Sequence, residues 1–252
     1  MMVTALARPV TPTKPAPRLP GRRYDHLFFS GTALLMLATV FVGFGPTYYW
    51  AGGFRAPLPS FILHLHGAAF TSWILLLVTQ TSLVAAGRVN VHRRLGIAGF
   101  FLACLMVILG VLAAMDSLVR GGGRPGRDAK GFFLVPLSDM LVFSTLILLA
   151  YRFRSNPPTH KRLVFVATTG LLIAAVARWP LPLIHGHPGR AGLLSCTFLV
   201  LLGLYDLWST HKVHRVTLWA GAGLVFVQQA RIPLGKTATW HAFAAWVQSL
   251  AG

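Results

Sequence analysis

The sequence predicts an all-α protein: a bundle of seven transmembrane helices, with the N-terminus in the cytoplasm and the C-terminus outside, followed by a short interfacial helix. Hydrophobic residues make up 55% of the 252 residues and charged residues only 11%, whereas a soluble domain is about a quarter charged. The apolar residues form long stretches, and about 20 apolar residues in a row are enough to cross a bilayer as a helix. The 23 Lys and Arg residues lie mostly between these stretches.

The charge identifies the bilayer as the main partner. A formal charge of +18 on a soluble protein would indicate nucleic-acid binding. Here the basic residues flank apolar stretches, where Lys and Arg orient helices and contact anionic lipid headgroups. We therefore expect contact with lipid and no nucleic acid. A partner membrane complex or a homo-oligomer stays open.

The chain divides into three parts. Residues 1–26 are basic and rich in proline, and they lack the apolar core of a signal peptide. We expect this part to form an extended arm in the cytoplasm. Residues 27–233 form the transmembrane domain, and residues 234–252 form a C-terminal interfacial segment.

Seven apolar stretches in the transmembrane domain are long enough to span. The predicted spans are 27–49, 59–86, 95–116, 132–152, 162–183, 191–209 and 215–233. The seventh is the least apolar, because Gln228, Gln229 and Arg231 occupy its end. Residues 238–250 are too short to span, and Trp240 and Trp246 are typical of a helix that lies in the interface.

The distribution of basic residues predicts the orientation. Cytoplasmic loops of membrane proteins carry an excess of Lys and Arg. The N-terminal arm and the connections on its side of the membrane hold fourteen of the 23 basic residues, and the opposite side holds nine. The N-terminus is therefore predicted to be cytoplasmic.

A short histidine-containing string recurs where the four outward-going spans begin. The strings are YDHLFFSG, NVHRRLGIAG, PTHKRLVFVATTG and KVHRVTLWAG, and their histidines are His26, His92, His160 and His214. The simplest interpretation is that amphipathic side chains mark the headgroup zone. Duplication of a two-helix hairpin would explain the same pattern.

Polar side chains gather in the predicted outer halves of the spans. Ionisable residues inside a membrane are costly and are therefore candidates for function. Asp139 is expected about 10 Å deep at 1.5 Å per residue, and Arg178 lies at a similar depth, so the two could form a buried structural pair. The alternative is a polar pocket open to the exterior, formed by His64, Asp139, Arg178, Gln229 and Arg231. Asp206, near the cytoplasmic end, is expected to pair with Lys212 or Arg215.

Four histidines in the outer half are candidate ligands for a metal or haem: His64, His66, His185 and His187. His64 and His66 are two residues apart on a helix and point to nearly opposite faces, so they cannot easily bind one ion together. His185 and His187 lie in a loop, where an extended backbone places them on the same side. This pair with His64 or His66 could supply three imidazoles for zinc or copper. A solvated loop is the alternative.

Parts of the chain resemble known membrane proteins. The strings HLHGAAFTSWILLLVTQTSLVAAGRVNVHRRLGIAGF, PPTHKRLVFVATTGLLIAAVARWP and LYDLWSTHKVHRVTLWAGAGLVF resemble a family of uncharacterised bacterial polytopic inner-membrane proteins, which implies a multi-pass location in the inner membrane and no particular reaction. A weaker similarity is to transmembrane b-type cytochromes, in which histidines of neighbouring helices bind haem. His92 and His160 lie at the headgroup boundary, too shallow for such a haem.

Three classes of function stay open. The first is a redox, metal-binding or haem-binding protein that uses the outer histidines. The second is a small-molecule transporter or binder that uses the outer polar residues. The third is a non-catalytic partner of a membrane complex. The sequence contains no nucleotide-binding, zinc-protease or serine-hydrolase motif, so no enzymatic activity is assigned.

Overall fold

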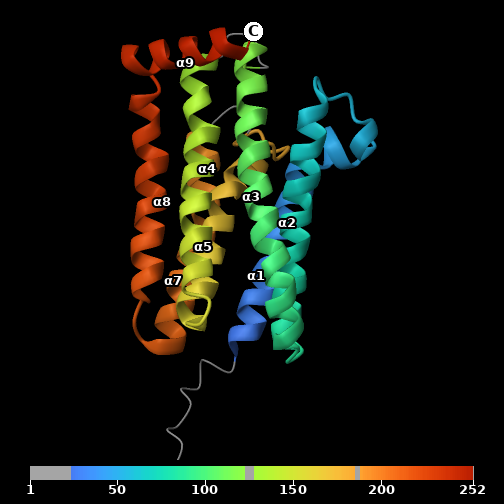
Figure 1. Cartoon of the computed structure of the whole chain (residues 1–252). Coiled ribbons are helices and arrows are strands. Elements are labelled where there is room, and N and C mark those ends of the chain that lie inside the picture. Colours follow the sequence, from blue (N-terminus) through green and yellow to red (C-terminus); the bar gives the residue numbers. More distant parts are fainter. Residues whose placement is uncertain (1–23, 123–127, 185–187, 252) are drawn as a thin grey trace, which may run out of the picture.

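The computed structural model describes residues 24–122, 128–184 and 188–251 (Figure 1). Helices and turns make up these residues, which confirms the all-α class. The main helices are α1 (Asp25–Phe44), α2 (Phe61–Ala85), α3 (Val89–Val119), α4 (Ala129–Arg152), α5 (Pro157–Val176), α6 (Pro188–Ser195), α7 (Thr197–Thr210), α8 (Arg215–Leu234) and α9 (Ala238–Ala251). Two short helices, η2 (Gly45–Tyr49) and η3 (Gly53–Arg55), lie between α1 and α2. The predicted arm lies almost entirely outside the described residues.

Six helical segments among the described residues are long and apolar enough to cross a membrane. They are residues 25–49, α2, α3, α4, α5 and residues 190–210, which combine most of α6 with α7. The seventh predicted span corresponds to α8, which has 20 residues and runs along the bundle beside α5 (Figure 1). Helix α8 is not among the six apolar segments, because its C-terminal end is polar. The protein is thus a multi-pass helical membrane protein with six clear spans.

The outer surface of the bundle is apolar. Large hydrophobic side chains point away from the protein, among them Phe101 at 67% exposure and Leu141 at 66%. Apolar surface of this extent is not found on water-soluble monomers, but it suits contact with lipid tails.

Helix α5 is the centre of the bundle. Buried residues make up 61% of its most apolar window, against 22–39% in the other five segments, and α5 packs against α1, α4, α6, α7 and α8. Close packing against α1 depends on Gly43, where a Cβ would lie 2.7 Å from the carbonyl carbon of Ala175. Small residues at such crossings let membrane helices approach each other closely.

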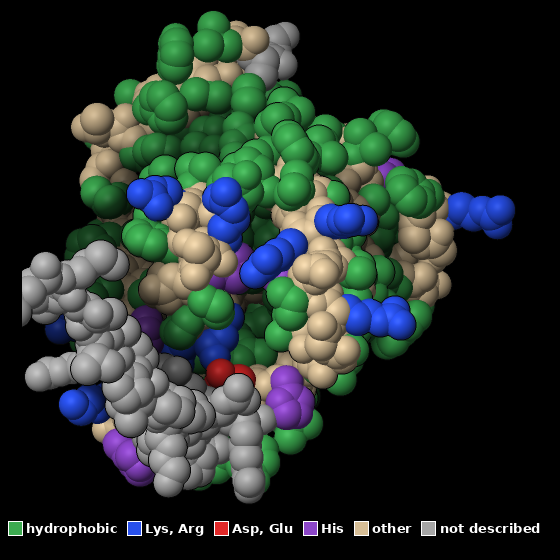
Figure 2. Space-filling view, turned by 60° about the horizontal axis from the view of Figure 1, so that its bottom comes forward, with side chains coloured by type: hydrophobic (Ala, Val, Ile, Leu, Met, Phe, Trp, Pro, Cys, Tyr) green, Lys and Arg blue, Asp and Glu red, His purple; other side chains and the backbone are tan. Residues whose placement is uncertain are grey.

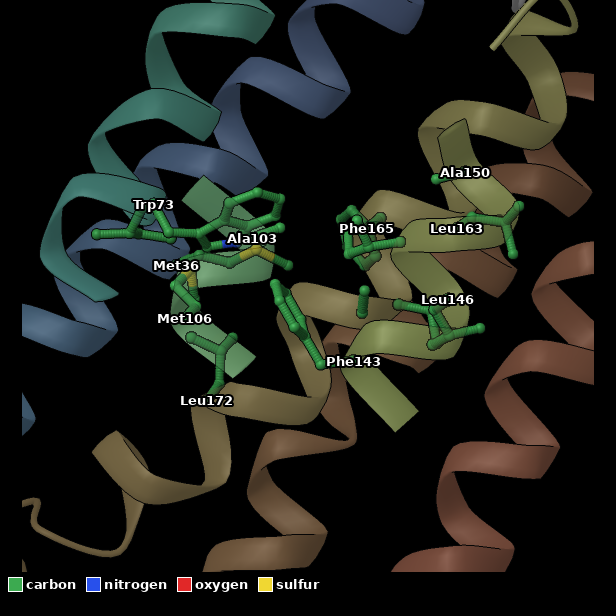
Figure 3. Packing of buried hydrophobic residues seen from close by; sticks show 14 of the residues in the cluster. Met36, Trp73, Ala103, Met106, Phe143, Leu146, Ala150, Leu163, Phe165 and Leu172 are labelled. Atoms are coloured by element: carbon green, nitrogen blue, oxygen red, sulfur yellow. The ribbon is translucent and has the colours of Figure 1, made fainter. Parts of the chain in front are cut away.

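The main core is formed by residues of α1 to α5, with further contributions from α7 and α8. Figure 3 shows Trp73 among these residues. Its ring meets Phe143 edge to face, with centroids 5.2 Å apart. Its Nε1 donates a hydrogen bond of 3.2 Å to Thr168 Oγ1, which satisfies the polar end of a buried tryptophan.

Helix α9 lies across one end of the bundle, opposite the end at which α1 begins (Figure 1). It packs on α3 and α4. Trp240 Nε1 donates to the carbonyl of Lys130 at 2.7 Å, and Gln248 Nε2 donates to the carbonyl of Leu118 at 3.3 Å. These bonds attach the C-terminal helix to two helix ends.

One predicted boundary was wrong. The fifth span was expected to end at residue 183, but α5 ends at Val176. Pro180 and Pro182 follow within six residues, and residues before a proline disfavour helical geometry. The sixth span was predicted at residues 191–209, and residues 190–210 form one segment long and apolar enough to cross a membrane, in which α6 and α7 meet at Cys196.

The α1–α5 contact gives a first prediction. Gly43→Leu should lower the stability of the protein by about 1–3 kcal/mol, the usual cost of overpacking, because the new side chain meets the backbone of Ala175. Gly31→Leu on the same helix is the matched control, since a Cβ there has no neighbour within 4 Å. Thermal unfolding in mild detergent measures both. Equal melting temperatures for the two variants would contradict the close approach.

Candidate functional site

The outer residues that the sequence nominated do not meet in one place. Asp139 and Arg231 form an ion pair between α4 and α8. His64 lies on α2 among aromatic rings, and Arg178 lies beyond the end of α5. His185 and His187 fall outside the described residues.

Arg178 does not pair with Asp139, contrary to expectation. Its Nη1 donates to the carbonyl of Ala174 at 2.6 Å, and its guanidinium lies over the ring of Phe44, 4.7 Å from the centroid. The early end of α5 explains the difference, because Arg178 sits in a turn that faces α1.

The two glutamines near the end of α8 differ in burial. Gln229 is exposed, whereas its neighbour Gln228 is 5% exposed. Gln228 lies three residues before Arg231 and four after Leu224, and all three are buried. A period of three to four residues marks one helix face, and this signal was present in the sequence.

His64 is enclosed by aromatic residues. It is 8% exposed, and the centroids of Tyr48, Phe54 and Phe61 lie 5.9–6.4 Å from that of its ring. Its Nδ1 has no hydrogen-bond partner among the described residues. On the same stripe, the hydroxyl of Thr71 lies 2.9 Å from that of Tyr49.

His66 has different neighbours from His64. Its ring contacts Phe70, with centroids 4.1 Å apart, and it reaches the backbone of Leu109 on α3. Within the described residues, no three His, Cys, Asp or Glu side chains gather closely enough to hold a metal ion. The described part of the protein therefore does not assemble the predicted outer metal site.

The Asp139–Arg231 pair is buried but only partly engaged. Arg231 Nη1 lies 2.5 Å from Asp139 Oδ1, and the same nitrogen also donates to Ser138 Oγ at 3.3 Å and to the carbonyl of Val135 at 3.4 Å. Side-chain exposure is 6% for Arg231 and 14% for Asp139. Three atoms of the pair make no hydrogen bond to the described residues: Nε and Nη2 of Arg231 and Oδ2 of Asp139. They are also not among the completely buried atoms that lack a partner. These atoms therefore retain some accessible surface.

A second buried pair, Arg162–Asp206, is fully engaged and lies at the other end of the bundle. Asp206 is 0% exposed and accepts hydrogen bonds from Arg162 Nε at 3.0 Å, Thr217 Oγ1 at 2.5 Å and the backbone N–H of His214 at 3.1 Å. Arg162 Nη2 also donates to Asp206, and Nη1 donates to the carbonyl of Pro158 at 2.8 Å. This pair joins α5, α7 and the start of α8.

The expected partners of Asp206 were wrong. Lys212 and Arg215 are both exposed, because they lie in and after the turn that leaves the bundle. Asp206 is on the buried face of α7, which contacts α5.

A neighbouring cluster extends the contacts to α1. Lys161 Nζ lies 2.6 Å from Asp25 Oδ2, and the hydroxyl of Tyr205 donates to Asp25 Oδ1 at 2.7 Å. The ring of Tyr205 stacks on Phe28, with centroids 3.9 Å apart. Ion pairs thus connect α1, α5 and α7 at this end, which carries many Lys and Arg side chains on its surface (Figure 2).

The contrast between the two pairs identifies the candidate site. A buried pair whose hydrogen-bonding atoms are all used is a structural element. Among the described residues, the Asp139–Arg231 pair leaves one carboxylate oxygen and two guanidinium nitrogens without a hydrogen bond. Comparisons with protein-family models, curated proteins and solved structures found no match to this chain, so the site is interpreted from its geometry alone.

The end that holds Arg162–Asp206 gives a pH prediction. His214 Nδ1 accepts a hydrogen bond of 3.2 Å from Val216 N–H and caps α8, which requires an unprotonated nitrogen. Burial lowers the pKa of His214 below its ordinary value of 6.5, and the Arg162 guanidinium lowers it further. The stability contributed by the neutral ring is therefore present above about pH 6.5 and lost as the pH falls below that value.

His214→Asn should remove this pH dependence, because asparagine is a good N-cap and does not titrate. Between pH 8 and pH 5.5, the melting temperature of the wild type should fall by more than that of the variant. Parallel curves would show that His214 does not contribute.

Proposed function

We propose that the protein is a seven-helix protein of the bacterial inner membrane that binds a small polar solute at Asp139 and Arg231, as a binder or transporter. The observation that carries the proposal is the unused hydrogen-bonding capacity of this buried pair. Charges inside a membrane protein are costly unless they are paired and hydrogen-bonded. A solute that completes the hydrogen bonds would gain this energy on binding.

The free atoms define the chemistry of the solute. Arg231 offers two N–H-bearing nitrogens, which suit a carboxylate through charge-assisted hydrogen bonds. Asp139 offers one carboxylate oxygen, which suits an ammonium group. A molecule that carries both groups, such as a free amino acid, is complementary to the pair and leaves no net charge buried.

Two prolines inside the helices near the pair support transport as well as binding. Pro136 lies inside α4, three residues before Asp139, and Pro233 lies inside α8, two residues after Arg231. Proline removes one helical hydrogen bond, and interrupted helices border the substrate sites of many transporters. Near the same point, Gly131 and Gly235 bring the two backbones together, so that a Cβ on Gly235 would lie 2.8 Å from the carbonyl oxygen of Gly131.

The other two function classes have less support. A haem or metal at His64, His66, His185 and His187 needs imidazoles that converge, whereas His64 and His66 have separate surroundings. No described feature favours a purely structural role in a larger complex.

Binding can be tested by thermal shift on the purified full-length protein with a panel of free amino acids. At a hundred times its dissociation constant, a bound solute adds about 2.7 kcal/mol of stability, and the melting temperature should rise accordingly. Acetate and methylammonium, which each carry one of the two groups, should give much smaller shifts.

Matched substitutions separate binding from folding. Asp139→Asn should fold and lose the shift, because it removes the charge that holds the ammonium group. Asp206→Asn should lower the stability of the protein by about 3–5 kcal/mol, since it leaves Arg162 buried without its partner. If Asp139→Asn collapses to the same extent, the outer pair is structural; if no amino acid shifts the melting temperature, the proposed solute is wrong.

The orientation can be tested with reporter fusions. A fusion after residue 212, between α7 and α8, should report the same side as the N-terminus, and a fusion at residue 252 should report the opposite side. The expectation follows from α8 as the seventh span, with the basic end in the cytoplasm. Fusions at 212 and 252 that report one side would show that α8 does not cross.

A further inference from the structure

Three polar side chains from three helices meet at the end of the bundle where α1 begins. The rings of His92 on α3 and His160 on α5 lie 6.4 Å apart between centroids. Gln80 on α2 lies beside His92: its Nε2 is 3.5 Å from the position of a Cβ on Gly96, one helical turn after His92. Two of the four recurrent histidines are thus brought together by segments 68 residues apart in the chain.

The hydrogen bonds in this cluster leave two buried side-chain atoms without a partner among the described residues. His160 Nδ1 lies 2.9 Å from the carbonyl oxygen of Ala150; a carbonyl can only accept, so this nitrogen carries the proton and Nε2 carries the lone pair. The ring of His92 lies close to the backbone of Gln80. Nδ1 of His92 and Oε1 of Gln80 are buried and have no partner among the described residues.

This is the arrangement in which proteins prepare imidazoles for a metal ion. A ligating histidine usually donates its second ring nitrogen to a carbonyl or carboxylate, which fixes the ring and the tautomer. His160 meets that condition through the carbonyl of Ala150. A bound cation would satisfy the unpartnered Nδ1 of His92 and Oε1 of Gln80.

The spacing fits a shared ion with a small adjustment. Two imidazoles that bind one tetrahedral ion at about 2.0–2.1 Å have ring centroids about 5 Å apart, and two on opposite sides of the ion have centroids about 6.4 Å apart. The observed 6.4 Å therefore needs a movement of about 1 Å at most. A haem must lie deep between membrane helices, whereas a single metal ion does not. The position of His92 and His160 near the headgroup boundary is therefore compatible with an ion.

The charge nearby does not oppose this arrangement strongly. Arg93 acts on His92 from the next residue, but its side chain is exposed. Exposed charges are screened by solvent and salt, so Arg93 raises the cost of a cation at this position only slightly.

We propose that His92, His160 and Gln80 form a binding site for one divalent transition-metal ion of the zinc or copper type. Imidazole nitrogen suits both metals, and the amide oxygen of Gln80 supplies a third ligand. The site lies at the end of the bundle opposite Asp139 and Arg231, and it does not depend on solute binding there.

Calorimetric titration of the chelator-treated full-length protein with Zn²⁺ tests the proposal. We expect one equivalent to bind to the wild type and the affinity to fall at least 100-fold in His92→Phe, which keeps a planar ring and removes the ligand. His211→Asn is the control, because His211 is exposed in a left-handed turn (φ 56°), a conformation that Asn tolerates. Equal affinity in wild type and His92→Phe, or a loss of binding in His211→Asn, would overturn the proposal.

A second measurement tests the two histidine ligands on the unaltered protein, and one variant then tests Gln80. Electron paramagnetic resonance of the protein with one equivalent of Cu²⁺ should show coupling to two imidazole nitrogens. Gln80→Leu should keep both nitrogen couplings and weaken the affinity for Zn²⁺. Coupling to one nitrogen or to none would exclude ligation by the His92–His160 pair.

Discussion

The burial of the Arg162–Asp206 pair is the constraint on which the bundle depends. Asp206 has no contact with solvent, so every lone pair of its carboxylate must be satisfied by protein. The donors come from the start of α5, the turn after α7 and the first turn of α8. A shift of any one of these helices would leave a buried charge without its partner. The loss of stability would be far larger than that from a lost surface contact. The pair therefore fixes how α7 and α8 pack beside the central helix α5.

The two ends of the molecule treat buried charge differently. At the end with Arg162, each charged group has several partners, and Lys161, Asp25 and Tyr205 extend the set to α1. At the end with Arg231, one guanidinium nitrogen serves three acceptors, and the remaining nitrogens are not used by the described residues. Full satisfaction gives rigidity, and partial satisfaction leaves binding capacity. This asymmetry is the physical reason for placing the solute site under α9 and not at the basic end.

The sequence was sufficient to predict the helices but not which charged residues pair between them. Apolar length predicted the main helices, and Trp240 and Trp246 predicted a short separate helix at the C-terminus, because both signals act locally. The arginine that pairs with Asp139 is determined by two features: the residue at which α5 ends, and the face of α8 that points into the bundle. The end of α5 was indicated by Pro180, and the inward face of α8 by the spacing of Leu224, Gln228 and Arg231. Contacts between α3 and α5, such as His92 with His160, have no local signal at all.

The recurrent histidines show how one sequence pattern serves several purposes. His26 is exposed, His214 caps α8 through Nδ1, and His92 and His160 face each other. A headgroup marker needs only the exposed position of His26. Two of the others are held by backbone groups: His214 by the N–H of Val216 and His160 by the carbonyl of Ala150. The same short string therefore serves different contacts at different helix starts.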